Sequence, residues 1–317
     1  MAFDSERSQS SINASGLVGM VREGFKFFRW KSGGACSPSH FDGLFRQIAE
    51  DAALYEKYTG QQFSDAHVLE IGFGQHPWRL IALVSMGIDA VGIDFDMPML
   101  SFSIPKTLAI LRRNGYRRAV KTAVRSLFFD GKERRAFAQA LKARGFDLRL
   151  EDKRLLIGDA TAHSFGEKAR FDFIYSYDVF EHVRSGDIDR LTRKVAALLS
   201  PGGVAVIAPF IFTGISGNHL PEWYPHQVRL RTLKKSEPWE HLRQNRYVAN
   251  TYLNRLTLAD YRRMFGTHFT VLEERVALPD LGREYLTPEV REELRDYPEE
   301  ELFSNKVLFI LRRKDVD

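Results

Sequence analysis

The sequence is poor in cysteine and has no long uninterrupted apolar run. Its one cysteine, Cys36, has no partner for an intramolecular disulfide, which is typical of a protein in a reducing compartment. No stretch approaches the roughly 18 to 20 apolar residues that a membrane span needs. The first residues, MAFDSERSQSS, also lack the basic and then apolar run of a signal peptide. We therefore expect a soluble, cytoplasmic protein.

No residue class is in large excess. Hydrophobic residues make up 44% and charged residues 27% of the 317 residues, ordinary globular values that exclude a disordered or collagen-like chain. The net charge is +5 with a pI near 9.2, a mild preference for anionic partners. This small sum conceals local fields: residues 97–153 carry 14 basic and 5 acidic side chains, whereas residues 289–301 carry 2 and 7.

From residue 67 onward, short apolar runs alternate with helical segments. Runs that are apolar throughout indicate strands buried on both faces, and their alternation with helices is typical of a parallel sheet. We therefore predict an α/β fold with a doubly wound, mostly parallel seven-stranded sheet. The predicted strands cover 67–73, 89–94, 154–159, 171–178, 202–210, 267–276 and 305–313, and the main helices cover 40–58, 78–86 and 187–199.

The predicted organisation is an N-terminal helical extension, residues 1–60, followed by one domain, residues 61–317. Within the extension, residues 17–31 mix aromatic and basic side chains. We expect this segment to pack on the domain, and the alternative is peripheral contact with a membrane. The domain is interrupted by a basic helical insertion at 97–153 and an acceptor lid at 210–260, and ends in the strands and acidic helix of 269–317.

A glycine turn and two acids carry the strongest functional signal. Glu70 ends a predicted buried strand that runs into Gly72 and Gly74, and Asp94 ends the next strand. Glycines let the backbone approach a ligand closely, and an acid in the second position accepts ribose hydroxyls. The residues after Gly74 are Gln-His-Pro, without the third glycine of a dinucleotide site. The pattern predicts a nucleoside-type cofactor.

At residues 66–210 the chain resembles the class I S-adenosylmethionine-dependent methyltransferases. The resemblance rests on five motifs in order: EIGFG, GIDFDMPML, GDA, FDFIYSYDVFEHV and LLSPGGVAVIAPF. It implies a Rossmann-like fold and S-adenosyl-L-methionine as cofactor. It also implies cofactor-binding roles: the methionine pocket for Glu70, Gly72 and Gly74, the ribose for Asp94, the adenine for Asp159 and Ala160, and backbone beside the sulfonium for Tyr177.

Two adjacent residues after the fourth strand are candidates for catalysis. His182 is placed to take a proton from a hydroxyl acceptor, with Glu181 beside it. The alternative for His182 is a structural hydrogen bond to a neighbouring loop. A further alternative is a metal ion held by this pair with His219 or His226 from the lid.

The predicted lid and the basic insertion do not identify the acceptor. Chain that leaves the fifth strand covers the cofactor crevice, so its aromatic and polar residues are candidates for binding the acceptor, the alternative being a small second core. The candidates are His219, Trp223, Tyr224, His226, Trp239 and Arg243. The insertion at 97–153 is a solvated helical pair, a phosphate-binding face, or a docking site for the acidic helix.

These observations predict a methyltransferase that O-methylates a polar or anionic acceptor, first a glycan or sugar of surface polysaccharide synthesis. An RNA methyltransferase is the first alternative, and a small-molecule or lipid-headgroup methyltransferase the second. Nucleic acid is less favoured because few aromatic residues lie among the basic ones. A non-catalytic module that binds cofactor or nucleic acid is the alternative outside enzymes.

Overall fold

The computed structural model describes residues 37–98, 108, 111–112, 131–166, 170–230, 234–244 and 252–314. The segment 17–31, with its predicted packing or membrane contact, lies outside these residues, as does most of the first half of the basic insertion. No helix in the described ranges is long and apolar enough to cross a membrane.

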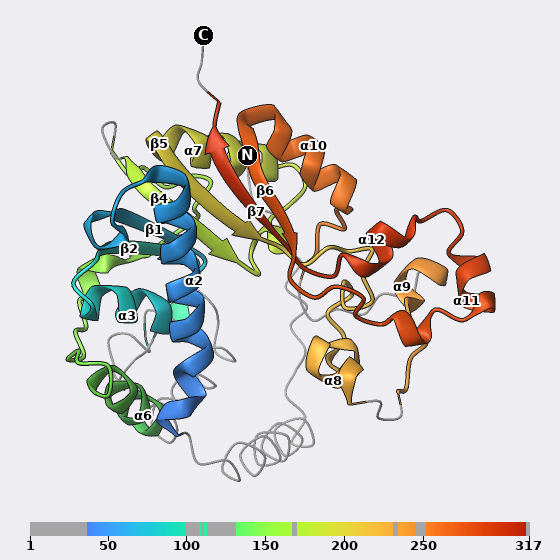
Figure 1. The fold of residues 1–317 in the computed structure, drawn as a ribbon, viewed down its shortest axis with the longest axis horizontal. Helices are drawn as coiled ribbons and strands as arrows, with labels where there is room; N and C mark the ends of the chain where they lie inside the picture. Colours follow the sequence, from blue (N-terminus) through green and yellow to red (C-terminus); the bar gives the residue numbers. More distant parts are fainter. Residues whose placement is uncertain are drawn as a thin grey trace.

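The centre of the fold is one seven-stranded sheet with the strand order β3-β2-β1-β4-β5-β7-β6, which confirms the predicted sheet (Figure 1). The first five strands in this order run parallel, whereas β7 is antiparallel to both of its neighbours. The strand bounds are β1 His67–Ile71, β2 Asp89–Asp94, β3 Leu155–Ile157, β4 Phe171–Tyr177, β5 Leu199–Ala208, β6 Phe269–Val276 and β7 Val307–Arg313.

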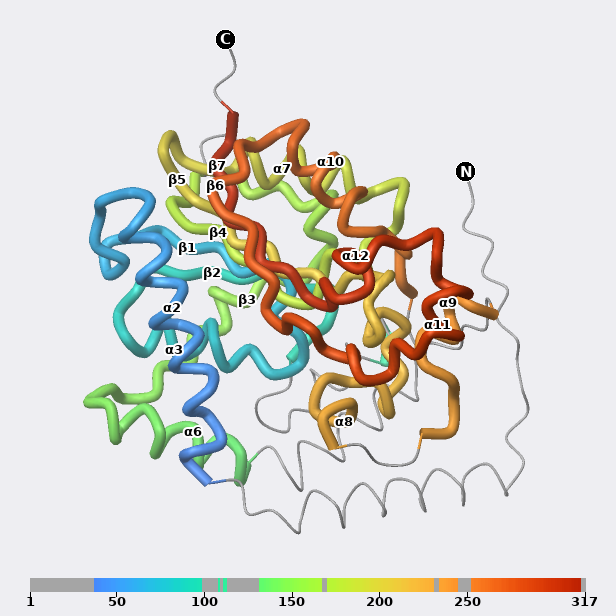
Figure 2. The backbone as a smooth tube through the Cα atoms, turned by 45° about the vertical axis from the view of Figure 1, so that its right-hand side comes forward, coloured from blue at the N-terminus to red at the C-terminus, as the bar shows by residue number. Residues whose placement is uncertain are grey.

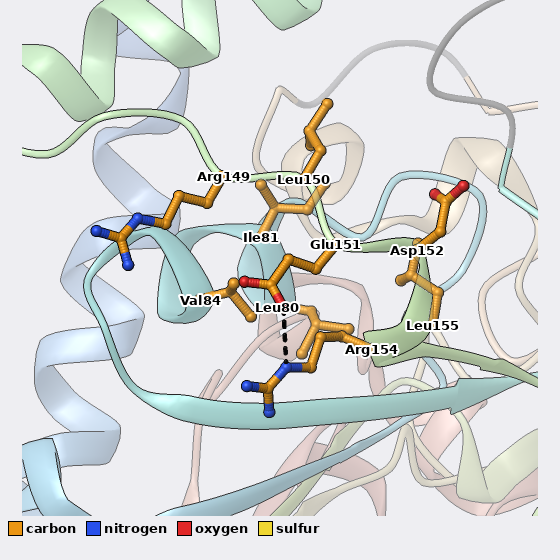
Figure 3. Close-up of a pocket in the computed structure, with 9 residues that line it drawn as sticks. All are labelled: Leu80, Ile81, Val84, Arg149, Leu150, Glu151, Asp152, Arg154 and Leu155. Carbon is orange, nitrogen blue, oxygen red and sulfur yellow. Dashed lines mark hydrogen bonds and ion pairs between the residues drawn. The ribbon is translucent and has the colours of Figure 1, made fainter.

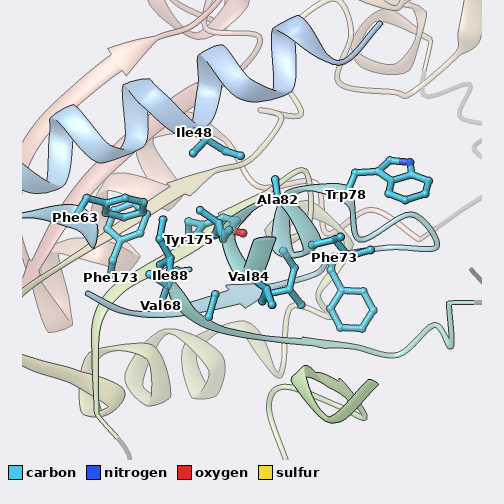
Figure 4. Close-up of a cluster of buried hydrophobic side chains, with 14 of the residues drawn as sticks. Ile48, Phe63, Val68, Phe73, Trp78, Ala82, Val84, Ile88, Phe173 and Tyr175 are labelled. Atoms are coloured by element: carbon cyan, nitrogen blue, oxygen red, sulfur yellow. The ribbon is translucent and has the colours of Figure 1, made fainter. Parts of the chain in front are cut away.

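Helices cover both faces of the sheet because alternate strand residues point to opposite sides. Val68 and Phe173 pack under α2, α3 and α6 on one face (Figure 4), and Leu69 and Ile174 pack under α7 and α10 on the other. The helix bounds are α2 Asp42–Thr59, α3 Trp78–Ser85, α6 Gly131–Lys142, α7 Ile188–Leu198 and α10 Leu258–His268. Short 3₁₀ turns are η1 Pro38–Phe41, η2 Phe63–Asp65, η4 Asp152–Arg154, η5 Phe180–His182, η6 Pro221–Trp223 and η7 Arg283–Tyr285.

The strand directions bring distant parts of the chain to one edge of the sheet. The carboxyl ends of β1 to β5 share this edge, which is where ligands bind in open α/β sheets. Because β7 is antiparallel to β5, the start of β7 at Val307 lies at the same edge. Residues just before β7 are therefore neighbours of the turns that follow β4 and β5.

A second core lies beside the sheet, in what we call the lid unit, formed by side chains between 215 and 242 and between 278 and 303. Figures 1 and 2 show this unit beside the end of β6 and the start of β7, which pair with each other. Its helices are α8 Pro225–Arg229, α9 Glu240–Arg243, α11 Pro288–Glu293 and α12 Glu299–Phe303. The predicted lid and part of the predicted C-terminal segment thus share one core.

The predicted acidic helix is wrong as a single element. It forms the two short helices α11 and α12, and Pro298 precedes the second because proline cannot donate the hydrogen bond that a helix interior requires. Three of its acids form ion pairs outside the segment: Glu293 with Arg243, Glu299 with Arg283 and Glu300 with Arg262. These partners lie in the lid unit and in α10, and none belongs to the basic insertion.

The described helix of the basic insertion, α6, is an integral part of the fold. Phe137 is fully buried, with its ring centroid 4.9 Å from that of Phe41 and 4.8 Å from that of Trp78. Trp78 Nε1 also donates a hydrogen bond to Glu133 Oε1 at 3.1 Å. The start of α3, and with it the end of the glycine turn, therefore packs directly on the insertion.

We predict that Phe137→Ala lowers the free energy of unfolding by about 3–5 kcal/mol, because it removes a buried ring and leaves a cavity. Denaturant unfolding followed by circular dichroism measures the change. The matched control is Arg135→Ala, at an exposed position of the same helix. Equal stability of the two variants would contradict this packing.

Candidate functional site

The glycine turn after β1 lies against the turn after β4. Gly72 has φ +87°, and a Cβ atom at this position would lie 2.1 Å from Val179 Cγ2, so only glycine permits this approach. Gly74 also has positive φ, +66°, but no atom lies within 4 Å of where its Cβ would be. The first glycine thus joins two turns, and the second borders open space.

The acids predicted for the cofactor lie at the ends of adjacent strands. Asp94, at the end of β2, accepts hydrogen bonds from the backbone N–H groups of Gly74 and Asp96, both at 2.7 Å. The Gly158 N–H donates to the Asp94 carbonyl at 2.9 Å, and Asp159 accepts the Thr161 N–H at 2.7 Å. These bonds tie the turns after β1, β2 and β3 together, with Ala160 beside them.

Glu70 lies in a buried polar cluster on the α2 and α3 face of the sheet. Burial raises the pKa of Glu70 to about 7, although the positive charge of Arg79 lowers it. Its Oε2 atom has no hydrogen-bond partner. Arg79 Nη1 lies 3.6 Å from Asp51 Oδ2, and its guanidinium lies 4.2 Å from the ring centre of Tyr177. Tyr177 donates its hydroxyl proton to Asp51 at 2.5 Å. Helices α2 and α3 therefore fix the last side chain of β4.

The turn after β4 and the chain that follows β5 bring together a buried acid, Glu181, and a largely buried imidazole, His219. Glu181 is only 3% exposed and neither of its carboxyl oxygens has a hydrogen-bond partner. His219 Nε2, which also has none, lies 4.0 Å from Glu181 Oε1. Burial and the charge of Asp178 raise the pKa of Glu181 to about 8, and burial lowers the pKa of His219 to about 4. Both groups are mostly neutral at neutral pH.

His182 lies next to this pair, with its ring centre 5.1 Å from that of His219. Its Nδ1 atom is 2.9 Å from the backbone carbonyl of Tyr252. A carbonyl oxygen only accepts, so in the neutral ring Nδ1 carries the proton and Nε2 keeps a lone pair. The loop hydrogen bond that sequence reasoning gave as an alternative is present, and it leaves Nε2 in the state that a base requires.

The predicted acceptor-binding residues of the lid divide into two groups. His219 lies at the sheet edge, the Tyr224 ring centre lies 6.2 Å from it, and the His226 ring stacks on Tyr224 at 6.4 Å. The other three are structural parts of the lid unit: Trp223 and Trp239 are core residues, and Arg243 forms a bidentate ion pair with Glu293.

The indoles of Trp223 and Trp239 are 1% and 0% exposed, so neither offers a face to an acceptor. Trp223 instead donates its Nε1–H to Ser236 at 2.8 Å. The small second core, which sequence reasoning gave as the alternative, is what the structure contains.

Among the residues that the structure describes, no three His, Cys, Asp or Glu side chains are grouped to hold a metal ion. The metal alternative for Glu181, His182 and the lid histidines therefore gains no support from the geometry.

The sequence analysis did not identify four charged residues of the candidate site, Asp51, Arg79, Asp178 and Lys306, nor the aromatic Phe95. Phe95 follows Asp94 directly and is 65% exposed, an unusual state for a large apolar ring. Asp51 and Arg79 were detectable as single charges on otherwise apolar helix faces. Lys306 was detectable only through the antiparallel direction of the last strand.

The structure also has a small surface pocket that is lined by none of the candidate site residues. It lies between α3 and the segment that enters β3, with Leu80, Ile81 and Leu150 among its lining residues (Figure 3). Glu151 and Arg154, which also line it, form an ion pair within this segment. It borders the start of β3, and the candidate site is at the opposite ends of the strands.

Comparisons with known proteins point to one family. A family model described as a methyltransferase domain matches residues 44–268, which include both sides of the site. No curated protein matches the chain. The family model carries the assignment, since the structural similarities that follow are distant.

Three solved structures illustrate these similarities. The protein PH0226 of Pyrococcus horikoshii is 16% identical, with a TM-score of 0.43 over 85% of this chain and 91% of that chain. The CcbJ methyltransferase of Streptomyces caelestis is 15% identical, with a TM-score of 0.42 over 83% and 94%. Phosphoethanolamine N-methyltransferase 2 of Haemonchus contortus is 16% identical, with a TM-score of 0.42 over 84% and 53%.

We predict that Glu181→Gln stabilises the protein in a pH-dependent way. The pKa of Glu181 is raised from 4.5 to about 8 in the folded chain, so its contribution to stability is lost as pH rises between these values. Glutamine has no such loss. The gain in the free energy of unfolding is therefore small at about pH 5 and about 3–5 kcal/mol at about pH 9. Denaturant titrations of both proteins measure it, and a gain independent of pH would contradict the buried neutral acid.

Proposed function

The chain belongs to the methyltransferase-domain family, and we propose that it transfers a methyl group from S-adenosylmethionine to a hydroxyl of a small polar acceptor held between the sheet edge and the lid unit. The observation that carries the proposal is the contact of Gly72 with Val179, which joins the cofactor-side turn to the turn bearing Glu181 and His182. In this proposal, the residues that bind the methyl donor therefore lie next to the residues that bind the acceptor.

The residues on the cofactor side fit this molecule. The unpartnered, buried Oε2 of Glu70 is an acceptor for the ammonium group of its methionine part. The open space at Gly74 leaves room for its chain, and the carboxylate of Asp94 suits ribose hydroxyls. Asp159 and Ala160, with the exposed ring of Phe95, complete the adenine side of the proposed site.

The cofactor supplies an activated methyl group on a good leaving group, so the protein has to align the acceptor, exclude water and take up its proton. We assign proton uptake to Nε2 of His182, because Nδ1 is held as a donor by the Tyr252 carbonyl. Glu181 and His219 present unpartnered polar atoms that hydrogen-bond the acceptor. Tyr177 contributes backbone at the end of β4, with its ring fixed by Arg79 and Asp51.

A sugar hydroxyl remains our first acceptor, and surface polysaccharide synthesis its first context. Support for it comes from the polar groups of Glu181, His182 and His219, and from the half-buried Tyr224 with the exposed His226 stacked on it. Trp223 and Trp239, two of the predicted acceptor-binding residues, do not support it, because both are buried in the lid unit.

Asp94→Ala is expected to weaken the binding of S-adenosylmethionine at least about tenfold, since the change removes both a ribose acceptor and the link to the Gly74 N–H. Isothermal titration calorimetry measures the affinity. Asp65→Ala, at an exposed position outside the site, is the control. Unchanged affinity of the Asp94 variant would rule out the proposed cofactor side.

His182→Ala is expected to reduce turnover about 100-fold or more while cofactor affinity stays the same, because a general base acts only in the chemical step. Turnover is followed as formation of S-adenosylhomocysteine in cell extract that supplies the acceptor. His40→Ala, at an exposed position far along the chain, serves as the matched control. If the His182 variant turns over normally, another group takes the proton.

A further inference from the structure

Lys306 has an unusual position for a lysine. It precedes β7, and its ammonium group reaches the carboxyl ends of β4 and β5, where Nζ lies 2.5 Å from Asp178 Oδ1. Nζ also lies 5.7 Å from the ring centre of Tyr177 and 5.3 Å from that of Phe210. The side chain is only 17% exposed. One cation thus contacts the last residue of β4 and the chain that leaves β5.

Its partner Asp178 is in a conformation that needs support. Asp178 has φ +60°, in the left-handed region, which non-glycine residues adopt only where their surroundings hold them. Its N–H donates to the Ala208 carbonyl at 3.0 Å, and its carboxylate is 48% exposed apart from the ion pair with Lys306. The backbone N–H of Asp178 is thus held by β5, and its side chain is held by Lys306.

The same turn carries Glu181 and is fixed at its other end. The Asn254 N–H donates to the Glu181 carbonyl at 2.8 Å, and Asn254 Nδ2 donates to the Phe180 carbonyl at 2.7 Å. These bonds hold the end of the turn, whereas the Lys306–Asp178 pair holds its beginning. Glu181 thus has its backbone held by the second anchor, while its carboxyl group lies 4.0 Å from His219 Nε2 without a hydrogen-bond partner.

We propose that Lys306 and Asp178 are positioning residues of the acceptor site: their ion pair holds the turn after β4 so that the Glu181 carboxyl stays opposite His219. The role in methyl transfer rests on the proposed function, whereas the effect on Glu181 does not. Neither residue needs to touch the acceptor for this role.

The electrostatics give the pair a signature of its own. Burial is the main cause of the raised pKa of Glu181, the negative charge of Asp178 adds to it, and the positive charge of Lys306 opposes it. Among the residues that the structure describes, the other titratable groups near Glu181 are His219, at 4.0 Å, and Tyr261 from α10, and the ring of His182 packs on His219. Removing the charge of Lys306 therefore raises the pKa of Glu181, whereas removing the charge of Asp178 lowers it.

Isotope-edited infrared spectroscopy of protein with labelled glutamate follows this titration directly, without cofactor or acceptor. The spectrum of Glu181→Gln, taken under the same conditions, is subtracted to remove Glu70, which titrates in the same range. Relative to the unmodified protein, we expect the midpoint to rise by about 1 pH unit in Lys306→Met and to fall by about 1 in Asp178→Asn. Asparagine keeps the tolerance for positive φ and removes only the charge.

Lys306→Arg is the conservative variant, and its midpoint is expected to stay near that of the unmodified protein. In turnover assays, Lys306→Met is expected to lower kcat about tenfold with the KM for S-adenosylmethionine unchanged, and Lys306→Arg to restore most of it. A pair that only fastens two strands would lower the melting temperature and leave the kcat of the folded protein intact.

Midpoints that stay unchanged, or that move in the same direction in both variants, would overturn the proposal. So would a kcat for Lys306→Met equal to that of the unmodified protein. Opposite midpoint shifts in a protein that transfers no methyl group would retain the coupling of the pair to Glu181 and contradict only the proposed function, so the two failures are distinguishable.

Discussion

The contact between Gly72 and Val179 is the constraint on which the rest of the site depends. Because no side chain stands between them, the turns after β1 and β4 lie in van der Waals contact at the edge of the sheet. Ser176 Oγ supports the contact by donating to the Ile71 carbonyl at 2.9 Å. On one side of this contact are the residues assigned to the cofactor, and on the other are Glu181 and His182.

Buried carboxyl groups are the main energetic cost of this arrangement. Glu70 and Glu181 lie in low-dielectric surroundings that raise their pKa values, and in each at least one buried oxygen lacks a partner. Such groups destabilise the isolated protein and become useful where a ligand supplies the missing hydrogen bond. Asp51 differs, because Tyr177 and Arg79 satisfy it within the protein. The two unsatisfied acids lie one on each side of the Gly72–Val179 contact.

Local patterns predicted the strands and the turns at the edge of the sheet, and long-range packing decided the rest. The positions of Gly72, Asp94 and Asp159 were predictable because each lies at or just after the end of a strand, and strand and turn are encoded within a few residues. Aromatic content alone does not distinguish a binding face from a core, so Trp223 and Trp239 were assigned to the acceptor and lie in a core instead. Lys306 is 128 residues from Asp178 in sequence, and only the antiparallel β7 brings them together.

The most direct test is transfer of tritiated methyl groups from labelled S-adenosylmethionine into fractionated cell extract by the full chain. If the site holds the cofactor next to a polar acceptor, the tritium label enters the fraction of small polar molecules. The Glu181→Gln variant then transfers less label into this fraction. If calorimetry shows bound cofactor but no fraction gains label above a heat-inactivated control, methyl transfer at this site is contradicted.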